Sequence, residues 1–473
     1  MENSLSKSLD DVFHPKSIAM IGASASFGKW GQMIFSNMVA GSFPGKVYPV
    51  NPRETAIFGI PAYKRVQEIP EPVDLAIITT PADTVLSVLE DCGQRGVRAA
   101  VVVTSGFSET GEKGKALERR MSALCREKRI VLIGPNTMGI LCTRSRLFAT
   151  GTHTRPREGG VAFVSQSGNL GVQLIHWAER QGVGVSLFVG SGNEAMVTCS
   201  DYLEYLSEDA GSRTIMLYLE SMREGRRFFE TAKKINRTKP IIVLKGGRTE
   251  AGRAASASHT GAMSGEVKIF RAACRQAGLL EAGVPSELLD LSAGFSSLPL
   301  PRGNRVGIVT LGGGWGVVTS DECNEKGLAV PPLPQEVVDR IGKHLPPFWS
   351  RGNPVDLVGT RNPEAPLVAV EELLKWEGID AVISLGIVGR IEFLRLMNQS
   401  IRAVDKNTPP GFLDQTEAMV RDYEEKYIAA TVELMEKYAK PVIGASLVST
   451  SGGTVRSVPG RRYSAVLYET PES

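Results

Sequence analysis

His259 stands among small residues in the run Ser256-Ala-Ser-His-Thr-Gly261. These neighbours leave room for a group as bulky as a phosphoryl, and a neutral imidazole nitrogen is nucleophilic near pH 7. A phosphate-carrying imidazole needs one nitrogen free and the other held by an acceptor, best a carboxylate. Glu220 ends the apolar strand expected at 215–219, at the sheet edge where the His259 loop should lie. We therefore predict His259 and Glu220 as catalytic residues; the alternative is a surface histidine or one hydrogen-bonded in the core.

Two glycine-rich helix starts add a second chemical signal. Each should present free backbone N–H groups and the positive end of a helix dipole. Two such ends aimed at one point would stabilise a phosphorylated histidine, whose charge is costly to bury. Each loop taken alone is also compatible with an ordinary tight turn. The residues predicted to bind phosphate are Ser165, Ser167, Gly168, Gly312, Gly313 and Gly314.

A third glycine loop runs from Gly22 to Gly31, between an apolar strand and a helix, where backbone N–H groups can receive phosphate. The next strand ends in Asn51-Pro52-Arg53, where an NAD site would carry an acidic residue. A cation there suits the 3′-phosphate of coenzyme A or the 2′-phosphate of NADP; a packing turn without a ligand is the third possibility. The residues predicted to bind the cofactor are Gly22, Ser24, Gly28, Lys29, Asn51, Arg53, Thr80, Pro81, Ser105, Gly106 and Asn136.

Buried parallel strands must position these loops. Short Val- and Ile-rich runs that do not alternate with polar residues are separated by helix-like segments, which predicts an α/β chain. The first runs are expected at 17–21, 47–50, 75–79, 99–103 and 130–133. Parallel sheets bind ligands at the carboxyl ends of their strands, and these ends are rich in Gly, Pro and small polar residues.

Two further strand series divide the rest of the chain. One begins at 161–164 and ends near Leu298, and the other begins at 306–310, after a linker-like stretch at 299–303. We expect domains at 1–150, 151–298 and 299–473. The openings of the last two series echo one another as strand, glycine loop and helix, although any α/β domain can start this way. The polar segment 405–425 is expected to be a loop leading into a helix.

Composition excludes several classes of protein. A net charge of +3 from 54 basic and 51 acidic residues is too even for a nucleic-acid-binding protein. The six cysteines form no CxxC pair, so neither a zinc site nor a disulfide framework is expected, and no metal ligands are predicted. No apolar run has the length of a membrane span, and the polar N-terminus does not read as a signal peptide, so we expect a cytoplasmic protein.

Taken together, the segments resemble the α subunit of the NDP-forming acyl-CoA synthetases, of the ADP-forming acetate–CoA ligase type, which are related to succinyl-CoA synthetase. The resemblance runs in order from about residue 9 to about residue 360. It rests on Ser17-Ile-Ala-Met-Ile-Gly-Ala-Ser24, Gly45-Lys-Val-Tyr-Pro-Val-Asn-Pro52, Ser105-Gly-Phe-Ser-Glu-Thr-Gly111, Gly134-Pro-Asn136, Ser165-Gln-Ser-Gly168, Tyr218-Leu-Glu220, Ser258-His-Thr-Gly261 and Asn353-Pro-Val-Asp-Leu357.

The resemblance implies a Rossmann-like CoA-binding domain followed by two flavodoxin-like ligase domains. It implies that acyl-CoA and phosphate give an acyl phosphate, that His259 takes the phosphoryl group with Glu220 as its orienting carboxylate, and that ADP or GDP receives it. We identify no nucleotide-grasping domain, so ATP or ADP with Mg is expected on a separate β subunit, in a heterotetramer. The bulky Trp315 departs from the family's Asn-Ala-Gly-Gly-Pro-Gly pattern, and residues 390–440 find no match.

Two other functions stay open on the sequence alone. An NADP-dependent oxidoreductase would use the first domain but leaves the His259 loop unexplained. A non-catalytic CoA-binding protein would keep the fold without carrying phosphate on histidine. The acyl group, the choice of ADP or GDP and the physiological direction cannot be read from the sequence.

Overall fold

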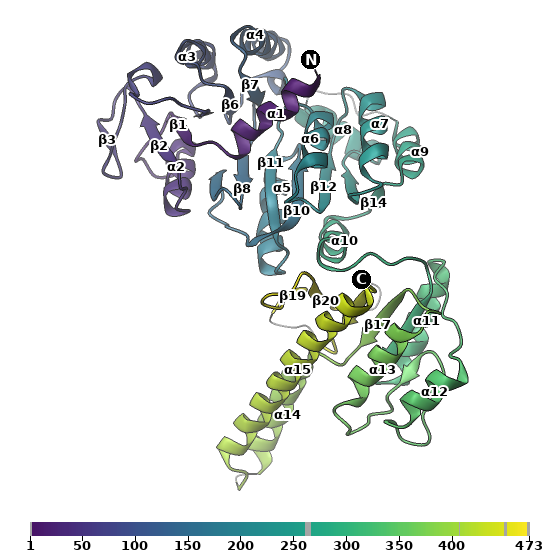
Figure 1. Cartoon of the computed structure of the whole chain (residues 1–473). Coiled ribbons are helices and arrows are strands. Elements are labelled where there is room, and N and C mark those ends of the chain that lie inside the picture. Colours follow the sequence, from purple (N-terminus) through teal and green to yellow (C-terminus); the bar gives the residue numbers. More distant parts are fainter. Residues whose placement is uncertain (1, 261–265, 406, 449–451, 471–473) are drawn as a thin grey trace. The chain divides into compact units, whose positions relative to one another are not determined.

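A computed structural model describes residues 2–260, 266–405, 407–448 and 452–470, without the side chains of 2–7, 256–260 and 410. The described chain divides into two compact units, Met1–Ser292 and Ala293–Ser473 (Figure 1). Every helix in the described ranges is too short or too polar to serve as a membrane span.

The first unit begins with a five-stranded parallel sheet in the order β2-β1-β5-β6-β7. Its strands are β1 (Ser17–Ile21), β2 (Lys46–Val50), β5 (Leu75–Ile78), β6 (Ala99–Val102) and β7 (Val131–Ile133). The associated helices are α1 (Glu2–Phe13), α2 (Trp30–Ala40), α3 (Ala82–Arg95) and α4 (Glu112–Lys128), with short 3-10 turns η1 (Val66–Glu68) and η2 (Ser108–Thr110) and a small hairpin, β3 (Ala56–Ile57) and β4 (Ile60–Pro61). The five strands lie within one residue of their predicted positions at each end.

The second sheet of this unit has seven strands in the order β14-β13-β12-β10-β11-β8-β9. Its strands are β8 (Gly139–Cys142), β9 (Leu147–Thr150), β10 (Glu158–Ser165), β11 (Val185–Gly190), β12 (Thr214–Leu219), β13 (Ile241–Lys245) and β14 (Leu280–Ala282). Its helices are α5 (Gly168–Arg180), α6 (Cys199–Glu208), α7 (Gly225–Ile235), α8 (Glu250–Thr260) and α9 (Val267–Ala277); α10 (Pro285–Ser297) follows. Because β8 pairs antiparallel with β11, the hairpin of residues 139–150 belongs to this second sheet.

One continuous apolar core joins the two sheets. It contains α1 residues such as Phe13, strand residues of both sheets and Tyr205 of α6. The rings of Phe13 and Tyr205 stack with centroids 5.2 Å apart. The buried Asn37 of α2 adds a polar link, because its Nδ2 donates to the carbonyl of Thr152 at 2.6 Å. The two sheets of the first unit thus share one core of packed side chains.

Gly31 in the first turn of α2 lets this helix start against the first glycine loop. A Cβ at this position would lie 1.9 Å from the carbonyl oxygen of Gly22. We expect Gly31→Ala to lower the free energy of unfolding by about 2–3 kcal/mol, because the helix must move off the loop. Gly411 holds the same second position in its helix, with open space around its Cβ site. Gly411→Ala should leave the free energy of unfolding unchanged or raise it by up to about 1 kcal/mol. Urea titrations of both variants measure this difference. Equal free energies of unfolding for the two variants would contradict the expectation.

The second unit contains a six-stranded sheet in the order β16-β15-β17-β18-β20-β19, in which β19 alone of the described strands is antiparallel to its neighbour. Its strands are β15 (Val306–Thr310), β16 (Val355–Asp356), β17 (Ala381–Leu385), β18 (Val442–Ala445), β19 (Val455–Ser457) and β20 (Ser464–Tyr468). Its helices are α11 (Gly313–Glu325), α12 (Gln335–Gly342), α13 (Ala365–Lys375), α14 (Arg390–Val404) and α15 (Pro410–Tyr438). The loop-then-helix prediction for 405–425 is confirmed by α15.

The predicted echo between the two strand–helix openings is confirmed in atomic detail. The Ser165 hydroxyl at the end of β10 donates to the carbonyl of Ser167 at 2.7 Å. The Thr310 hydroxyl at the end of β15 donates to the carbonyl of Gly312 at 2.8 Å. The helices that follow, α5 and α11, are both 13 residues long. The same hydroxyl-to-carbonyl bond therefore shapes both turns.

Candidate active site

A cavity of about 400 Å³ lies where the carboxyl ends of the first sheet meet the β10–α5 turn of the second. It is lined by four residues predicted to bind the cofactor and two predicted to bind phosphate: Thr80, Pro81, Ser105, Asn136, Ser167 and Gly168. Predicted residues from two different domains therefore share one cavity, as expected for strands that end at the same edge.

The first glycine loop borders this edge through backbone contacts. Gly22 has φ +88°, and a Cβ there would lie 2.7 Å from the Thr79 hydroxyl oxygen, so only glycine fits this turn. Gly28 also has positive φ, +82°. Lys29 is the N-cap of α2 and makes no side-chain capping bond. Trp30, the first residue of α2, lines the cavity. The loop thus brings the start of α2 to the cavity, as the phosphate-loop prediction requires.

The side chains of Ser24 and Asn51 are engaged within the protein. The buried Ser24 hydroxyl donates to Glu54 Oε1 at 3.2 Å, and Asn51 Nδ2 donates to the Ala23 carbonyl at 2.8 Å. Asn51 Oδ1 accepts the backbone N–H of Arg53 at 2.8 Å, while the Arg53 side chain is exposed. Ser24 and Asn51 therefore shape the loops, and both donate to Glu54, an acidic residue next to Arg53 that is not among the predicted site residues.

A polar network ties Asn136 to the loop after β6. Asn136 Nδ2 donates to Asn193 Oδ1 at 3.2 Å, and Asn193 Nδ2 donates to Glu109 Oε2 at 2.6 Å. Glu109 Oε1 in turn accepts the N–H groups of Gly106 and Phe107 at 2.6 and 3.1 Å. Burial alone would raise the pKa of Glu109, but these hydrogen bonds hold it below its usual value. The Ser105–Gly106 loop is therefore clamped by a carboxylate that the sequence reading did not single out.

The β10–α5 turn presents a helix N-terminus to the cavity. Ser167 is the N-cap of α5 and makes no side-chain capping bond, and Ser167, Gly168 and Asn169 all line the cavity. A Cβ on Gly168 would lie 2.2 Å from Met138 Cγ, so the close approach of this helix requires glycine. The Ser165 hydroxyl is used by the turn itself, so its role as a direct phosphate ligand stays a prediction.

Glu220 sits at the end of β12, next to this turn, and only 6% of it is exposed. Its Oε1 accepts the Tyr218 hydroxyl at 3.2 Å. The buried Lys245 at the end of β13 donates Nζ to the Glu220 carbonyl oxygen at 2.7 Å, and burial lowers the pKa of this lysine. A Cβ on Gly246 would lie 3.3 Å from Glu220 Cγ, so the chain that leads towards α8 passes directly over this carboxylate.

The backbone of His259 lies in the last turn of α8. Its side chain falls outside the described residues, so the predicted pairing of His259 with Glu220 stays a prediction. Helix α8 begins after β13, and β13 pairs with β12, the strand that ends just before Glu220. Helix α8 also packs against η2, in the loop clamped by Glu109. The backbone path of α8 thus runs from the Glu220 side to the loop after β6.

In the second unit, Gly312 is the N-cap of α11, and the Cβ sites of Gly312 and Gly314 open onto free space. A Cβ on Gly313 would lie 3.0 Å from Asp356 Oδ2, which places a carboxylate beside this helix start. Asp356 belongs to the motif Asn353-Pro-Val-Asp-Leu357, which is distant from these glycines in the sequence. Their phosphate-binding role stays a prediction.

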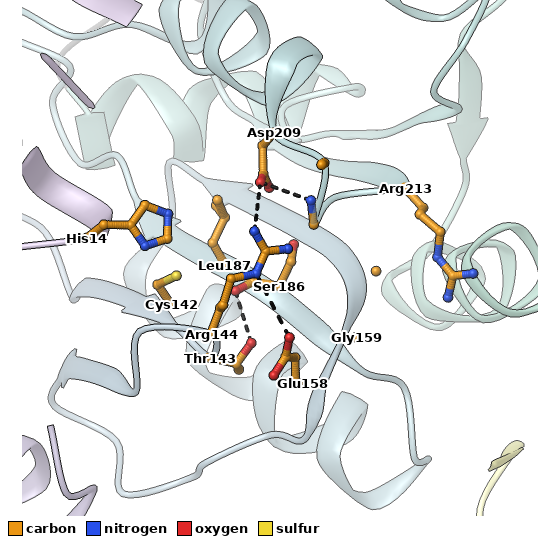
Figure 2. A pocket seen from close by; sticks show the side chains of 13 residues that line it. His14, Cys142, Thr143, Arg144, Glu158, Gly159, Ser186, Leu187, Asp209 and Arg213 are labelled. Atoms are coloured by element: carbon orange, nitrogen blue, oxygen red, sulfur yellow. Dashed lines mark hydrogen bonds and ion pairs between the residues drawn. The ribbon is translucent and has the colours of Figure 1, made fainter. Parts of the chain in front are cut away.

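A larger cavity of about 450 Å³ lies at the amino ends of β10 to β12 and contains none of the predicted residues (Figure 2). Arg144 reaches across it between Asp209 and Glu158, at 3.8 and 4.0 Å. Parallel sheets bind ligands at their carboxyl ends, so we place the active site in the smaller cavity. No cluster of three His, Cys, Asp or Glu side chains that could hold a metal is present in the described ranges.

Comparisons with known proteins agree with this geometry. The chain matches models of a CoA-binding domain at residues 16–143, a succinyl-CoA ligase-like flavodoxin domain at 158–295 and a ligase-CoA domain at 306–398. The α/β fold of a CoA-binding domain followed by two ligase domains is therefore confirmed.

Similar proteins cover most of the chain. The subunit alpha of acetate–CoA ligase [ADP-forming] II from Pyrococcus furiosus is 41% identical over 380 residues, 80% of this chain and 82% of that protein. Acetate–CoA ligase [ADP-forming] from Methanocaldococcus jannaschii is 40% identical over 353 residues, 75% of this chain but only 49% of that longer protein.

A solved structure extends the match to nearly the whole fold. Dinucleotide forming acetyl-coenzyme A synthetase 1 of Ca. Korarchaeum cryptofilum, in complex with phosphate and ADP, has a TM-score of 0.83 and 33% identity, and the match covers 98% of this chain and 94% of that one. These findings give no support to an NADP-dependent oxidoreductase. The chain belongs to the family of the α subunits of ADP-forming acetate–CoA ligases.

Proposed function

We propose that this chain is the α subunit of an ADP-forming acyl-CoA synthetase. It is an acid–thiol ligase that interconverts acyl-CoA, phosphate and ADP with a carboxylic acid, CoA and ATP. The observation that carries the proposal is the cavity that joins the strand ends of the CoA-binding domain to the N-terminus of α5. One site then receives both a thioester and a phosphate, which is the requirement for making an acyl phosphate.

Coenzyme A fits the residues at this edge. The glycine turn at Gly22 permits close backbone approach, and the Thr80 hydroxyl is buried with no hydrogen-bond partner among the described residues. When bound, coenzyme A supplies the thiol that forms and releases the thioester. The glycine loop and Lys29 would face its pyrophosphate, Arg53 its 3′-phosphate, and Thr80, Pro81, Ser105, Gly106 and Asn136 its pantetheine arm.

The chain's own residues account for the phosphoryl steps. A phosphate oxygen attacks the thioester carbonyl, and the thiolate of CoA leaves, giving an acyl phosphate. A nitrogen of His259 then attacks phosphorus, and the carboxylate leaves with the electron pair of the broken P–O bond. Glu220 would hold the other ring nitrogen and stabilise the imidazolium. The amide-lined helix start at Ser167–Gly168 would bind phosphoryl oxygens in the first unit, and the helix start at Gly312–Gly314 would do the same in the second unit.

A separate nucleotide-binding β subunit would complete the enzyme. The curated relative from Pyrococcus furiosus is named a subunit alpha, and the longer relative from Methanocaldococcus jannaschii has about half of its length outside the match. We propose that ADP or ATP and Mg bind to this partner, in a heterotetramer of two α and two β chains that acts on a small carboxylic acid. We propose the domain boundaries 1–150, 151–298 and 299–473, except that the hairpin of residues 139–150 belongs by its strand pairing to the second sheet.

Ligand-induced stabilisation tests the proposal. Coenzyme A should raise the Tm of the chain and NADP should not, because ligand binding to the native state stabilises it. Dephospho-CoA should bind about tenfold more weakly than CoA, and Arg53→Ala should remove this difference by deleting the contact to the 3′-phosphate. Arg65→Ala, which removes an exposed arginine paired with Asp91, should preserve it. A larger shift with NADP than with CoA would contradict the assignment.

A further inference from the structure

Gln166 stands between Ser165 and Ser167 in the β10–α5 turn, yet its side chain forms hydrogen bonds with the backbone that follows β12. Its Oε1 accepts the backbone N–H of Glu220 at 2.7 Å and that of Ser221 at 2.9 Å. Its Nε2 donates to the Ser221 carbonyl and to Glu194 Oε1, both at 3.0 Å. Two backbone donors and two acceptors fix which end of the amide is oxygen, and every hydrogen-bonding position of this side chain is used.

Glu194 accepts the hydrogen bond from Gln166 Nε2, although its own burial and backbone conformation are unfavourable. Its side chain is buried, with 4% of the residue exposed, and its backbone has φ +53°, a left-handed conformation uncommon outside glycine. Burial raises its pKa, and the Ser191 hydroxyl donates to the same Oε1 at 2.9 Å. A buried carboxyl and a strained backbone at one residue persist where the surrounding structure holds them, and such positions cluster at functional sites.

The same residue also lines the active-site cavity. Gln166 contributes to its wall with Ser167 and Gly168 of the α5 N-terminus. One side chain therefore spans from the turn predicted to hold phosphate to the peptide N–H groups of Glu220 and Ser221. A shift of Gln166 would displace the Glu220 carboxylate relative to the phosphate turn.

We propose that Gln166, held by Glu194, is a positioning residue that sets the place of Glu220 relative to the phosphate-binding turn; this rests on the proposed function. Lys245, which donates to the Glu220 carbonyl, secures the other side of the same segment. Gln166 thus aligns the carboxylate with His259 at the stage when the phosphoryl group is transferred.

The test compares Gln166→Ala with the parent chain, reconstituted with its nucleotide-binding partner. The measured quantities are kcat, the KM for CoA and the rate at which acetyl phosphate labels the chain. We expect kcat and the labelling rate to fall by about 30- to 100-fold, as for a misplacement of roughly 1 Å, with the KM for CoA changed by less than about threefold. Gln94→Ala, an exposed glutamine next to Glu90, should match the parent.

A second variant separates positioning from a packing effect and serves if Gln166→Ala does not fold. Gln166→Glu keeps the shape but places a second carboxyl against Glu194. At low pH a proton on one of the two acids restores the donor that Nε2 supplied. As pH rises both acids ionise, repel one another and lose the bond. The activity of this variant relative to the parent should therefore be highest at low pH and fall as pH rises.

Two results would overturn the inference: a parental kcat in Gln166→Ala, or a pH profile of Gln166→Glu parallel to that of the parent. A change confined to a higher KM for CoA, with kcat at the parental value, would also overturn it, because that result assigns Gln166 to substrate binding. Failure of the proposed function looks different. In that case a His259→Asn chain would still accept the label, whatever the Gln166 variants do.

Discussion

His259→Asn is expected to abolish net synthesis of ATP from acetyl-CoA, phosphate and ADP, with a loss of at least about 10³-fold in kcat. Asparagine fills much of the same space but cannot accept a phosphoryl group, and removal of a covalent nucleophile leaves only the binding contributions to catalysis. The assay is steady-state turnover of the chain with its nucleotide-binding partner. The Tm shift caused by CoA should persist, since the cavity that would hold CoA lies at the strand ends and not on α8.

His176 provides the matched control. It lies exposed on α5, with its Nδ1 3.4 Å from the Thr154 hydroxyl. The same substitution there, His176→Asn, should leave kcat at the parental value. A rate within tenfold of the parent in His259→Asn, or an equal loss in both variants, would contradict the role of His259.

Glu220→Gln carries the second large effect, a fall in kcat of roughly 10²- to 10⁴-fold. The amide keeps the size of the side chain and an oxygen that can accept the Tyr218 hydroxyl. It removes the charge that stabilises the imidazolium formed when histidine is phosphorylated. Because Glu220 is buried, no solvent cation replaces that interaction. Turnover and the rate of labelling by acetyl phosphate should fall together, with the KM for acetyl-CoA unchanged.

Glu224→Gln, four residues further along, removes an exposed carboxylate that pairs with Arg227. Exposed ion pairs contribute little, so this variant should retain parental turnover and a nearly unchanged Tm. If Glu220→Gln turns over like Glu224→Gln, Glu220 does not act on the histidine.

The sequence predicted the parts of the site that depend on local pattern. Strand ends follow from unalternated apolar runs, so Thr80, Ser105 and Asn136 were placed at one edge without any tertiary information. The glycine loop between strand and helix predicted a tight turn at Gly22, where the structure has a positive φ that favours glycine; its role in binding the cofactor stays a prediction. The helix start at Gly168 followed from the same reasoning.

Tertiary contacts explain what the sequence did not reveal. The side chains of Ser24 and Asn51 bond to neighbouring loops, and no local pattern predicts that a polar residue will be used in this way. Asn193 and Glu194 lie in a loop without a recognisable motif, and they acquire their roles only when β11 is placed beside β10 and the first domain. The hairpin of residues 139–150 joins the second sheet for the same reason: β8 pairs with the distant strand β11, and β9 pairs with β8.

Mapping the phosphoryl group tests the central claim most directly. The full chain is incubated with acetyl phosphate, digested under alkaline conditions that preserve phosphohistidine, and the peptide spanning residues 250–266 is sequenced by mass spectrometry. We predict one acid-labile phosphoryl group, on residue 259, which disappears when the partner and ADP are added. A phosphoryl group on any other residue, or none under conditions in which the enzyme turns over, would contradict the account.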